Sequence, residues 1–182
     1  MTNSTTAPIF VDSNVRIYVR DSAAADKQAQ AADWLAELWR SHRGRLSSQV
    51  LSELYVNATQ KLRPGLDRET ARGDVRALSA WQPIPLDEQV FDEAWHIQDR
   101  YGLSFRDALI VGAACVCGCG YVLSEDLQDG QDLAGVRVVS PFLHRPSDIS
   151  WRSQRHALGR TAPSRSALVA TTARWKSVRG KS

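Results

Sequence analysis

Short apolar segments that alternate with longer amphipathic ones constrain the fold of this chain more than any other feature. Residues 9–11, 121–123 and 136–139 are mostly apolar and rich in β-branched or aromatic residues, and each is too short to form a helix. Elsewhere, apolar residues recur at near-helical spacing, for example over residues 26–40. Strands that alternate with helices in this way predict an α/β fold with a largely parallel sheet.

The boundaries of the other predicted elements come from helix caps and chain breakers. Polar residues of the kind that favour helix N-caps precede further helical segments, and proline or glycine interrupts the chain between several of them. We expect helices capped by Ser48, Asp67 and Asp87 that extend to about residues 58, 80 and 97, and a further helix from Ser104 to about residue 115. Residues 45–47 are predicted to form a second short strand. Pro83 and Pro85 restrict residues 81–85 to an edge strand or a loop.

Charge is distributed unevenly between a body and a tail. Residues 1–143 contain 14 Lys and Arg against 19 Asp and Glu, whereas residues 144–182 contain 9 Lys and Arg and 1 acidic residue. The apolar periodicity also ends near residue 147, where Ser, Arg, Ala and Thr begin to dominate. We therefore predict one globular domain over residues 1–146 and a basic, mostly disordered extension over residues 147–182.

The composition argues against a membrane protein and against a disulfide-rich secreted one. No apolar run approaches the roughly 20 residues that a membrane-spanning helix needs, and the N-terminus does not resemble a signal peptide, so we expect a cytoplasmic protein. Cys115, Cys117 and Cys119 are odd in number and closely spaced, which is not typical of a disulfide framework or of a structural zinc site. We interpret them as small buried residues at a helix end.

Acidic residues stand at the edges of the predicted apolar elements, and the four of interest are Asp12, Glu53, Asp107 and Asp126. Asp12 and Asp126 each follow a predicted strand, whereas Glu53 and Asp107 lie in predicted helices. In parallel α/β folds, ligands bind beyond the carboxyl ends of the strands. Asp12 and Asp126 are therefore expected where a ligand would bind.

Each acid also has a plain structural interpretation. Glu53 would be an exposed helix glutamate. Asp107, in the first turn of a helix, would interact favourably with the helix dipole, and Asp126 would cap the residues that follow it.

A carboxylate beside a buried strand is desolvated unless something pairs with it, and converging carboxylates repel one another. A hard divalent cation such as Mg²⁺, which prefers oxygen ligands, relieves both costs. The set therefore points to metal-dependent chemistry on a phosphate.

The order and context of these residues resemble the PIN-domain nucleases, and most closely the toxins of VapBC-type toxin–antitoxin modules. The resemblance covers about residues 8–143. It rests on Phe-Val-Asp-Ser-Asn-Val at 10–15, Gln-Val-Leu-Ser-Glu-Leu at 49–54, Ser-Phe-Arg-Asp-Ala-Leu-Ile at 104–110 and Val-Leu-Ser-Glu-Asp-Leu-Gln-Asp-Gly at 122–130. Two features depart from the family's pattern: Arg16 replaces a usually apolar residue, and the tail after residue 143 is longer than this family needs.

The resemblance implies a three-layer α/β/α sandwich around a central, mainly parallel sheet. It implies that one or two Mg²⁺ ions, with Mn²⁺ as an alternative, are held by the catalytic residues Asp12, Glu53, Asp107 and Asp126. Asn14 and Ser124 would orient these carboxylates or a water bound to the metal. Asp129 is a weaker candidate for the same role, with capping of the turn before Gly130 as its alternative. The reaction would be hydrolysis of RNA phosphodiester bonds by water that the metal activates.

The same resemblance implies binding partners. Toxins of this kind are usually homodimers that a small antitoxin neutralises, so we expect an RNA substrate, a cognate antitoxin, a second copy of the chain and no membrane. Trp34, Leu38, Trp39 and Tyr55 either cover an antitoxin segment or pack in the core, which is the plainer interpretation. The basic tail either contacts the RNA backbone or is a solvated extension.

Other functions remain as alternatives. A PIN nuclease that processes RNA would share the site and lack an antitoxin. A catalytically inactive PIN-like module would bind RNA or protein, although the presence of all four acids weighs against it. A phosphotransferase with Asp12 as its nucleophile usually needs a second aspartate two residues later, where this chain has Asn14.

Overall fold

A five-stranded sheet forms the centre of the protein, and the computed structural model describes residues 7–149 around it. The strands are β1 (Ile9–Val11), β2 (Gly44–Arg45), β3 (Tyr121–Leu123), β4 (Asp132–Leu133) and β5 (Val136–Val139). Their order is β2-β1-β3-β5-β4, with every pairing parallel except that of β4 with β5. The predicted α/β fold with a mainly parallel sheet is therefore confirmed.

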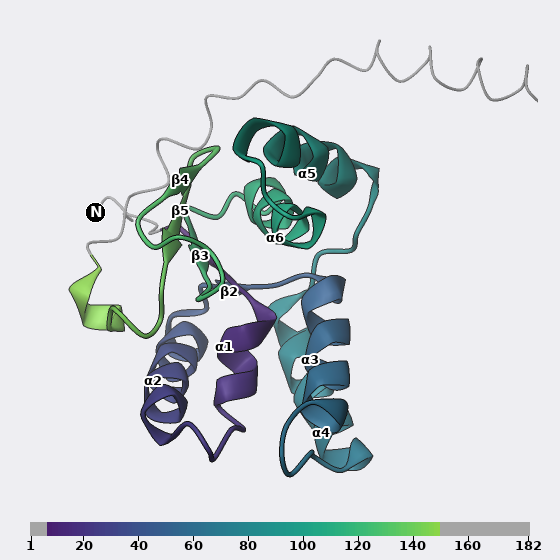
Figure 1. Ribbon diagram of the computed structural model, residues 1–182, viewed down its shortest axis with the longest axis vertical. Coiled ribbons are helices and arrows are strands. Elements are labelled where there is room, and N and C mark those ends of the chain that lie inside the picture. The colour runs from purple at the N-terminus through teal and green to yellow at the C-terminus, as the bar shows by residue number, and fades with distance from the viewer. Residues whose placement is uncertain (1–6, 150–182) are drawn as a thin grey trace, which may run out of the picture.

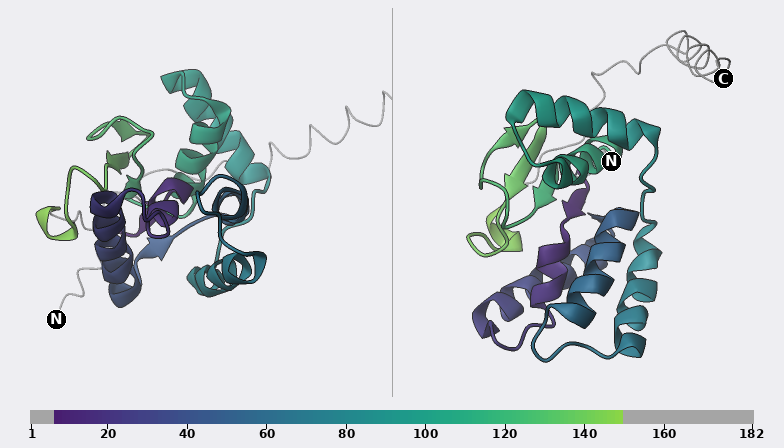
Figure 2. Two further views of the ribbon diagram at one scale, coloured as in Figure 1. Left: turned by 60° about the horizontal axis from the view of Figure 1, so that its bottom comes forward. Right: turned by 45° about the vertical axis from the view of Figure 1, so that its right-hand side comes forward.

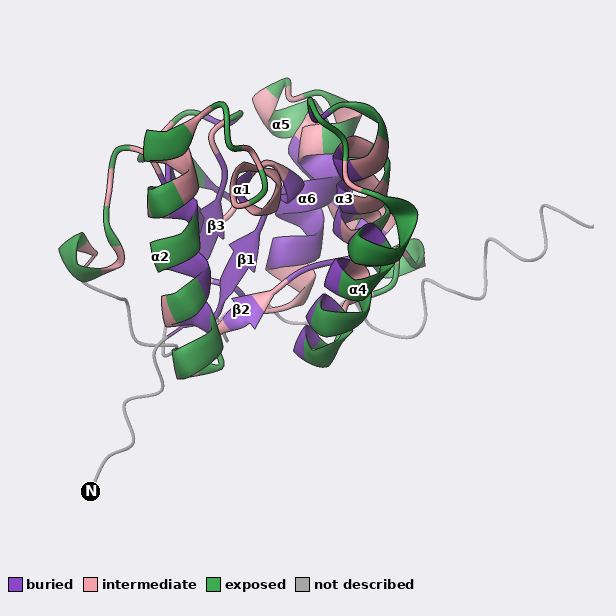
Figure 3. Ribbon diagram, turned by 90° about the horizontal axis from the view of Figure 1, so that it is seen from below, coloured by how far each residue is buried: buried purple, intermediate pink, exposed green. Residues whose placement is uncertain are grey.

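Helices cover both faces of this sheet. They are α1 (Ser13–Tyr18), α2 (Ala25–Ser41), α3 (Ser48–Gln60), α4 (Arg68–Leu78), α5 (Glu88–Tyr101) and α6 (Phe105–Val116), with short 3₁₀ helices η1 (Ser79–Trp81) and η2 (Pro146–Asp148). Figure 3 shows α2 on one side of the sheet and α6, α3 and α4 on the other. The chain continues from β1 directly into α1, which packs against both α2 and α3 (Figures 1 and 2). The layers are those of the expected α/β/α sandwich.

The α6 helix is the most buried helix of the fold. Every residue from Ala108 to Ala114 is buried, because the sheet covers one side of α6 and α5 packs on another (Figure 3). A Cβ atom on Gly112 would lie 2.9 Å from the backbone nitrogen of Ala94, so the close approach of α5 requires glycine at this position. This burial explains why the sequence of α6 is almost continuously apolar instead of showing one apolar stripe.

Several boundaries differ from the predicted ones. The N-cap of α3 is Ser47, whose hydroxyl accepts a hydrogen bond from the Val50 N–H, and not Ser48. The strand expected over residues 45–47 is β2, which ends at Arg45. Ser47 instead forms an isolated parallel bridge with Ile84, so the proline-containing segment lies as a loop against the sheet edge. The β4 strand was not predicted, because two residues are too few to show an alternating pattern.

Four apolar residues could cover an antitoxin segment or pack in the core: Trp34, Leu38, Trp39 and Tyr55. Two of them lie in the core and two at its border. Trp34 and Leu38 are buried, and the Trp34 indole N–H donates to the carbonyl oxygens of Pro141 and His144. Trp39 is 38% exposed and Tyr55 is partly buried. Core packing therefore accounts for Trp34 and Leu38.

The remaining sequence expectations concern the cysteines, the membrane and the tail. Cys119 is buried, Cys115 and Cys117 are partly buried, and all three are free thiols. No helix within residues 7–149 combines the length and the apolar character needed to cross a bilayer. The extension expected over residues 147–182 lies outside the described residues, apart from residues 147–149.

Candidate active site

Asp12 occupies the carboxyl end of β1, and only 4% of this residue is exposed. Its backbone N–H donates to the carbonyl oxygen of Leu123 on β3, which fixes its place at the edge of the sheet. Its carboxylate caps α1 by accepting a hydrogen bond from the Ser13 N–H at 2.6 Å. It also accepts from the Ser124 hydroxyl at 2.8 Å and from the Asn14 amide at 3.3 Å. All of these donors are neutral.

The electrostatic environment of Asp12 opposes its ionisation. Burial raises the pKa of this carboxyl group above its ordinary value, and the hydrogen bonds from Ser124 and Ser13 offset only part of that effect. The nearby carboxylates of Asp126 and Glu53 raise the pKa further. Asp12 is therefore a buried acid whose hydrogen bonds all come from neutral groups and which has two other acids nearby.

Asn14 connects the two strand ends of the site. Its amide nitrogen lies 3.3 Å from an oxygen of Asp12, 3.3 Å from the hydroxyl of Ser124 and 3.1 Å from an oxygen of Asp126. Its carbonyl oxygen is buried and has no hydrogen-bond partner within residues 7–149. A buried acceptor without a donor is costly, so this oxygen is suited to face a cation.

The turn after β3 supplies Ser124 and Asp126. Ser124 is fully buried, and its hydroxyl accepts a hydrogen bond from the Asp126 N–H at 3.2 Å while donating to Asp12. Glu125, between them, points to α2 and pairs with Lys27 at 2.6 Å. The parallel pairing of β1 with β3 therefore brings Asp12, Asn14, Ser124 and Asp126 together, as their positions at strand ends predicted.

Glu53 joins this group from α3 through Ser13. The Ser13 hydroxyl donates to Glu53 at 2.8 Å and lies 3.3 Å from Asp12. Gln49 donates to the other Glu53 oxygen at 3.0 Å, and Arg106 makes two hydrogen bonds to the carboxylate at 2.8 and 2.7 Å. Burial raises the pKa of Glu53, but the hydrogen bonds from Arg106, Gln49 and Ser13 together lower it below its ordinary value.

Arg106 and its partner Gln49 were not anticipated from the sequence. The Glu53 carboxylate raises the pKa of Arg106, and the charges of Asp12 and Asp107 add to that effect although burial opposes it. The guanidinium therefore lies within electrostatic range of three of the four predicted acids. The one signal in the sequence was a basic residue directly before Asp107.

Asp107 lies in the first turn of α6 and is held by the helix cap. The Ser104 hydroxyl donates to its carboxylate at 2.7 Å and accepts from its N–H at 3.2 Å. Ser104 is thus the N-cap of α6, at the residue where the sequence predicted the helix to start. Within the described residues, no hydrogen bond joins Asp107 to Asp12, Glu53 or Asp126.

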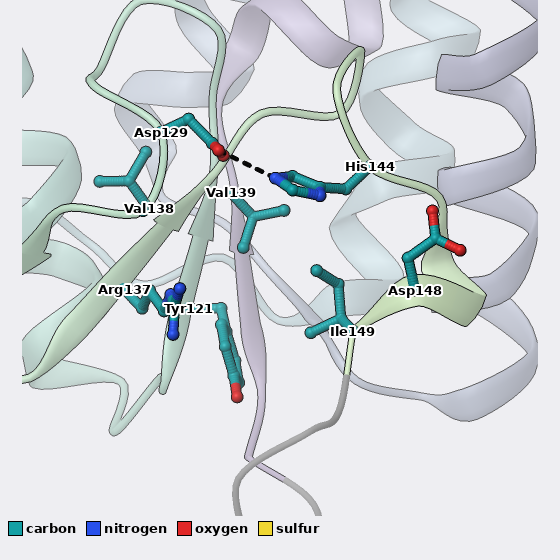
Figure 4. A pocket seen from close by; sticks show the side chains of 9 residues that line it. Tyr121, Asp129, Arg137, Val138, Val139, His144, Asp148 and Ile149 are labelled. Atoms are coloured by element: carbon teal, nitrogen blue, oxygen red, sulfur yellow. Dashed lines mark hydrogen bonds and ion pairs between the residues drawn. The ribbon is translucent and has the colours of Figure 1, made fainter.

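Asp129 faces a different part of the molecule. Its carboxylate accepts a hydrogen bond from the Ser140 N–H at 2.8 Å and contacts the His144 ring at 2.9 Å. Figure 4 shows this contact at the wall of a cavity of about 300 Å³ that Arg137 and Asp148 also line. Within residues 7–149, no hydrogen bond links Asp129 to the other predicted site residues.

The donor atoms of the site fit a hard divalent cation. All four predicted ligands are carboxylates, which Mg²⁺ and Mn²⁺ prefer. The Asn14 carbonyl oxygen, which has no hydrogen-bond partner within residues 7–149, is a further oxygen ligand that a metal could use. The side chains of residues 7–149 nevertheless form no ready-made group of three or more metal-binding residues. Glu53 already accepts from Arg106, Gln49 and Ser13, so it would exchange one of these partners on binding a cation, whereas Asp107, among the described residues, accepts only from Ser104 and keeps open positions.

The chain belongs to the PIN-domain family, because the sequence model of the PIN domain matches residues 9–128. This confirms the resemblance that the acidic motifs suggested. No curated protein matches the sequence.

Two solved structures match this chain. A chain of a toxin–antitoxin complex from Klebsiella pneumoniae has a TM-score of 0.52 and 19% sequence identity, over 74% of this chain and 98% of that chain. A chain of VapBC2 from Rickettsia felis, bound to a DNA fragment from the promoter, has a TM-score of 0.49 and 13% identity, over 71% and 96% of the two chains. At 19% identity the first match bears on the fold alone.

Proposed function

We propose that this protein is a metal-dependent endoribonuclease and that it acts as the toxin of a type II toxin–antitoxin system. The observation that carries the nuclease function is the environment of Asp12: a buried carboxylate that only neutral donors hydrogen-bond, with Asp126 and Glu53 close enough to raise its pKa. Such an arrangement is stabilised by a multivalent cation. Membership of the PIN-domain family supports the same conclusion.

In this proposal Asp12, Glu53, Asp107 and Asp126 hold Mg²⁺, with Mn²⁺ as an alternative. A bound divalent ion would stabilise negative charge on the phosphoryl oxygens and make water a stronger nucleophile. The protein's own part is to orient the carboxylates. Asn14 holds those of Asp12 and Asp126, and Ser124 holds Asp12 at 2.8 Å.

The contributions of the predicted residues differ in this proposal. Asp12 and Asp126 share the Asn14 amide, whereas Asp107 is held by Ser104 and has no hydrogen bond to the other acids within the described residues. Asp129 is the weakest candidate, because its carboxylate is already bound by Ser140 and His144. We propose that it stabilises the chain after β5 and affects the carboxylates only through the turn that carries Asp126.

The toxin role is supported by the similarity in fold to a chain of a toxin–antitoxin complex. That similarity extends over 98% of the other chain and 74% of this one, so the fold described here includes nearly all of the compared chain. The proposed partners are RNA, an antitoxin and a second copy of this chain. A small protein encoded beside this one that binds it and stops cleavage would support the role, and a nuclease that no such protein inhibits would favour RNA processing instead.

The nuclease function is tested by incubating the purified protein with a mixture of structured RNAs. We expect cleavage with Mg²⁺, none with EDTA, and a loss on the order of a hundredfold or more in the variant Asp12→Asn. Asp99→Asn, on the exposed face of α5, is the matched control and should cleave normally. Thermal unfolding of both variants establishes that they are folded.

Two outcomes would contradict this function. Cleavage that survives EDTA would remove the metal dependence, and full activity in Asp12→Asn would remove Asp12 from the site. RNA that is bound but never cleaved would favour an inactive binding module.

A further inference from the structure

Arg106 places a positive charge among the carboxylates of the site. It stands in the first turn of α6, one residue before Asp107, and its Nε and Nη2 atoms donate to the two oxygens of Glu53 at 2.8 and 2.7 Å. This is a bidentate pair, in which the planar guanidinium matches a planar anion. The residue therefore binds a predicted metal ligand from within the same chain.

The hydrogen bonds to Glu53 leave no free position on its carboxylate. One oxygen accepts from Arg106 and Gln49, and the other accepts from Arg106 and Ser13. A carboxylate offers about four lone-pair positions in all. A divalent cation that binds Glu53 must therefore displace at least one donor, and Arg106 is the donor whose charge the cation repels.

The exposure of the two partners indicates which one moves. The Arg106 side chain is 52% exposed, whereas that of Glu53 is 20% exposed and is also held by Gln49 and Ser13. Solvent weakens an ion pair of this kind, so its exchange costs little. Arg106 can leave Glu53 by rotation of a half-exposed side chain, without a change in α3 or α6.

The released guanidinium would find a second anion nearby. It precedes Asp107 in the first turn of α6 and contacts Glu53, so it lies beside two of the proposed metal ligands, and a phosphate bound to the metal would lie near it. Phosphate offers the same paired oxygens as a carboxylate, and arginine binds both in a bidentate manner.

We propose that Arg106 exchanges between Glu53 and a phosphate of the RNA backbone, so that it opposes binding of the divalent cation alone and favours binding of the cation together with RNA. This inference rests on the proposed nuclease function. It assigns to Arg106 a positioning role toward the substrate. If Arg106 only fastens α6 to α3, its removal would weaken the fold without tightening metal binding or altering RNA affinity.

Mn²⁺ binding in the absence of RNA gives the first test. We compare the full-length wild-type chain with Arg106→Gln, using calorimetry or the electron paramagnetic resonance of free Mn²⁺. Loss of a competing cation should tighten Mn²⁺ binding by about threefold to tenfold. Arg40→Gln is the matched control, because Arg40 forms an Arg–Glu pair of similar length with Glu37 on α2, outside the acidic site.

RNA binding gives the second test and should change in the opposite direction. A fluorescent single-stranded RNA of mixed sequence is titrated with Ca²⁺ in place of Mg²⁺, since Ca²⁺ keeps oxygen ligation but relaxes the octahedral geometry. Arg106→Gln should bind roughly tenfold more weakly, and the slope of log affinity against log salt should fall by about 0.7 to 1. Arg106→Lys keeps the charge, so it should restore the salt slope but only part of the affinity.

The two readouts separate this inference from the proposed function. Weaker or unchanged Mn²⁺ binding in Arg106→Gln, or an unchanged RNA salt slope, would overturn the exchange while leaving the nuclease intact. If wild-type protein and Arg106→Gln both fail to bind Mn²⁺, the proposed function itself is wrong and the inference falls with it. Should Arg106→Gln be unfolded, Arg106→Lys decides: RNA binding equal to wild type in both affinity and salt slope would overturn the bidentate contact.

Discussion

Two aspartates of the described chain are buried, Asp12 and Asp74, and their surroundings are opposite. Asp74 on α4 is bound by two arginines. Arg20 contacts both of its oxygens at 2.9 and 2.6 Å, and Arg16 lies at 3.5 Å. Asp12 receives hydrogen bonds from neutral groups alone and lies near two further acids. The same side chain is thus compensated at one position and left uncompensated at the other.

This difference separates a structural charge from a functional one. The ion pairs of Asp74 join α4 to α1 and the residues just after it, so their charges are satisfied within the fold. Arg16, which departs from the usual apolar residue of the family, is explained by this contact: burial lowers the pKa of its guanidinium, and Asp74 raises it in compensation. The charge of Asp12 has no such partner and is available to a ligand.

The largest expected effect that tests this comparison is on stability. Asp74→Asn leaves Arg16 and Arg20 without an anion. Arg16 is largely buried but Arg20 is 39% exposed and regains water, so the free energy of unfolding should fall by about 1–3 kcal/mol. Asp12→Asn removes a buried charge that no cation contacts, so it should leave stability unchanged or raise it. Chemical denaturation of both variants in EDTA measures the difference.

Activity should show the reverse pattern at temperatures where both variants are folded. Asp74→Asn should cleave RNA like the wild type, whereas Asp12→Asn should not. If Asp12→Asn destabilised the fold as much as Asp74→Asn, the distinction between the two charges would be lost.

The part of the site built on strand ends was predictable from the sequence. The strands that precede Asp12 and Asp126 were visible as apolar segments, and parallel pairing places their carboxyl ends at one edge of the sheet. The place of Ser124 followed from the same argument, whereas the roles of Asn14 and Ser124 came from the resemblance to the PIN-domain family. The α/β fold was predictable for the same reason, because short apolar segments and helical periodicity are local properties.

The contacts between helices were not predictable in this way. Arg106 reaches Glu53 across 53 positions of sequence, and Arg20 reaches Asp74 across 54, so nothing local marks either pair. Asp107 and its cap Ser104 lie within one turn and were predicted at the start of a helix, but the place of that helix relative to α3 depends on how α6 packs. Crossing geometry between helices is set by side-chain packing that one sequence does not reveal.

A second prediction concerns the amide that holds the uncompensated charge in place. Asn14→Ala removes the group that binds both Asp12 and Asp126, so these carboxylates should separate. Mn²⁺ affinity should fall by about tenfold to a hundredfold, as is typical when a residue that orients a metal ligand is lost. Asn57→Ala on α3 is the control with the same chemical change. Mn²⁺ binding that is equal in the two variants would show that Asn14 does not orient the ligands.

The smallest expected effect is on the pH dependence of stability in EDTA. Burial holds the pKa of Asp12 above its ordinary value of 3.8, so the folded protein retains this proton more readily than the unfolded chain. The free energy of unfolding should therefore fall as pH rises from about 3.8 through the folded pKa. Asp12→Asn cannot titrate at this position, so the wild type should lose stability over this range relative to the variant. Glu53 should behave in the opposite way, because its folded pKa is lowered by Arg106, Gln49 and Ser13 against the effect of burial.

The stabilising contribution of Glu53 should be fully present above its ordinary pKa of 4.5 and disappear as pH falls through its lowered folded value. Thermal unfolding of the wild type, Asp12→Asn and Glu53→Gln across this pH range measures both trends. We expect the stability–pH curves of Asp12→Asn and Glu53→Gln to diverge from that of the wild type in opposite directions. This result would mean that the charge of Asp12 is uncompensated and that the charge of Glu53 is compensated. Parallel curves would mean that Arg106 shields both carboxylates alike, and the contrast between the two sides of the site would then fail.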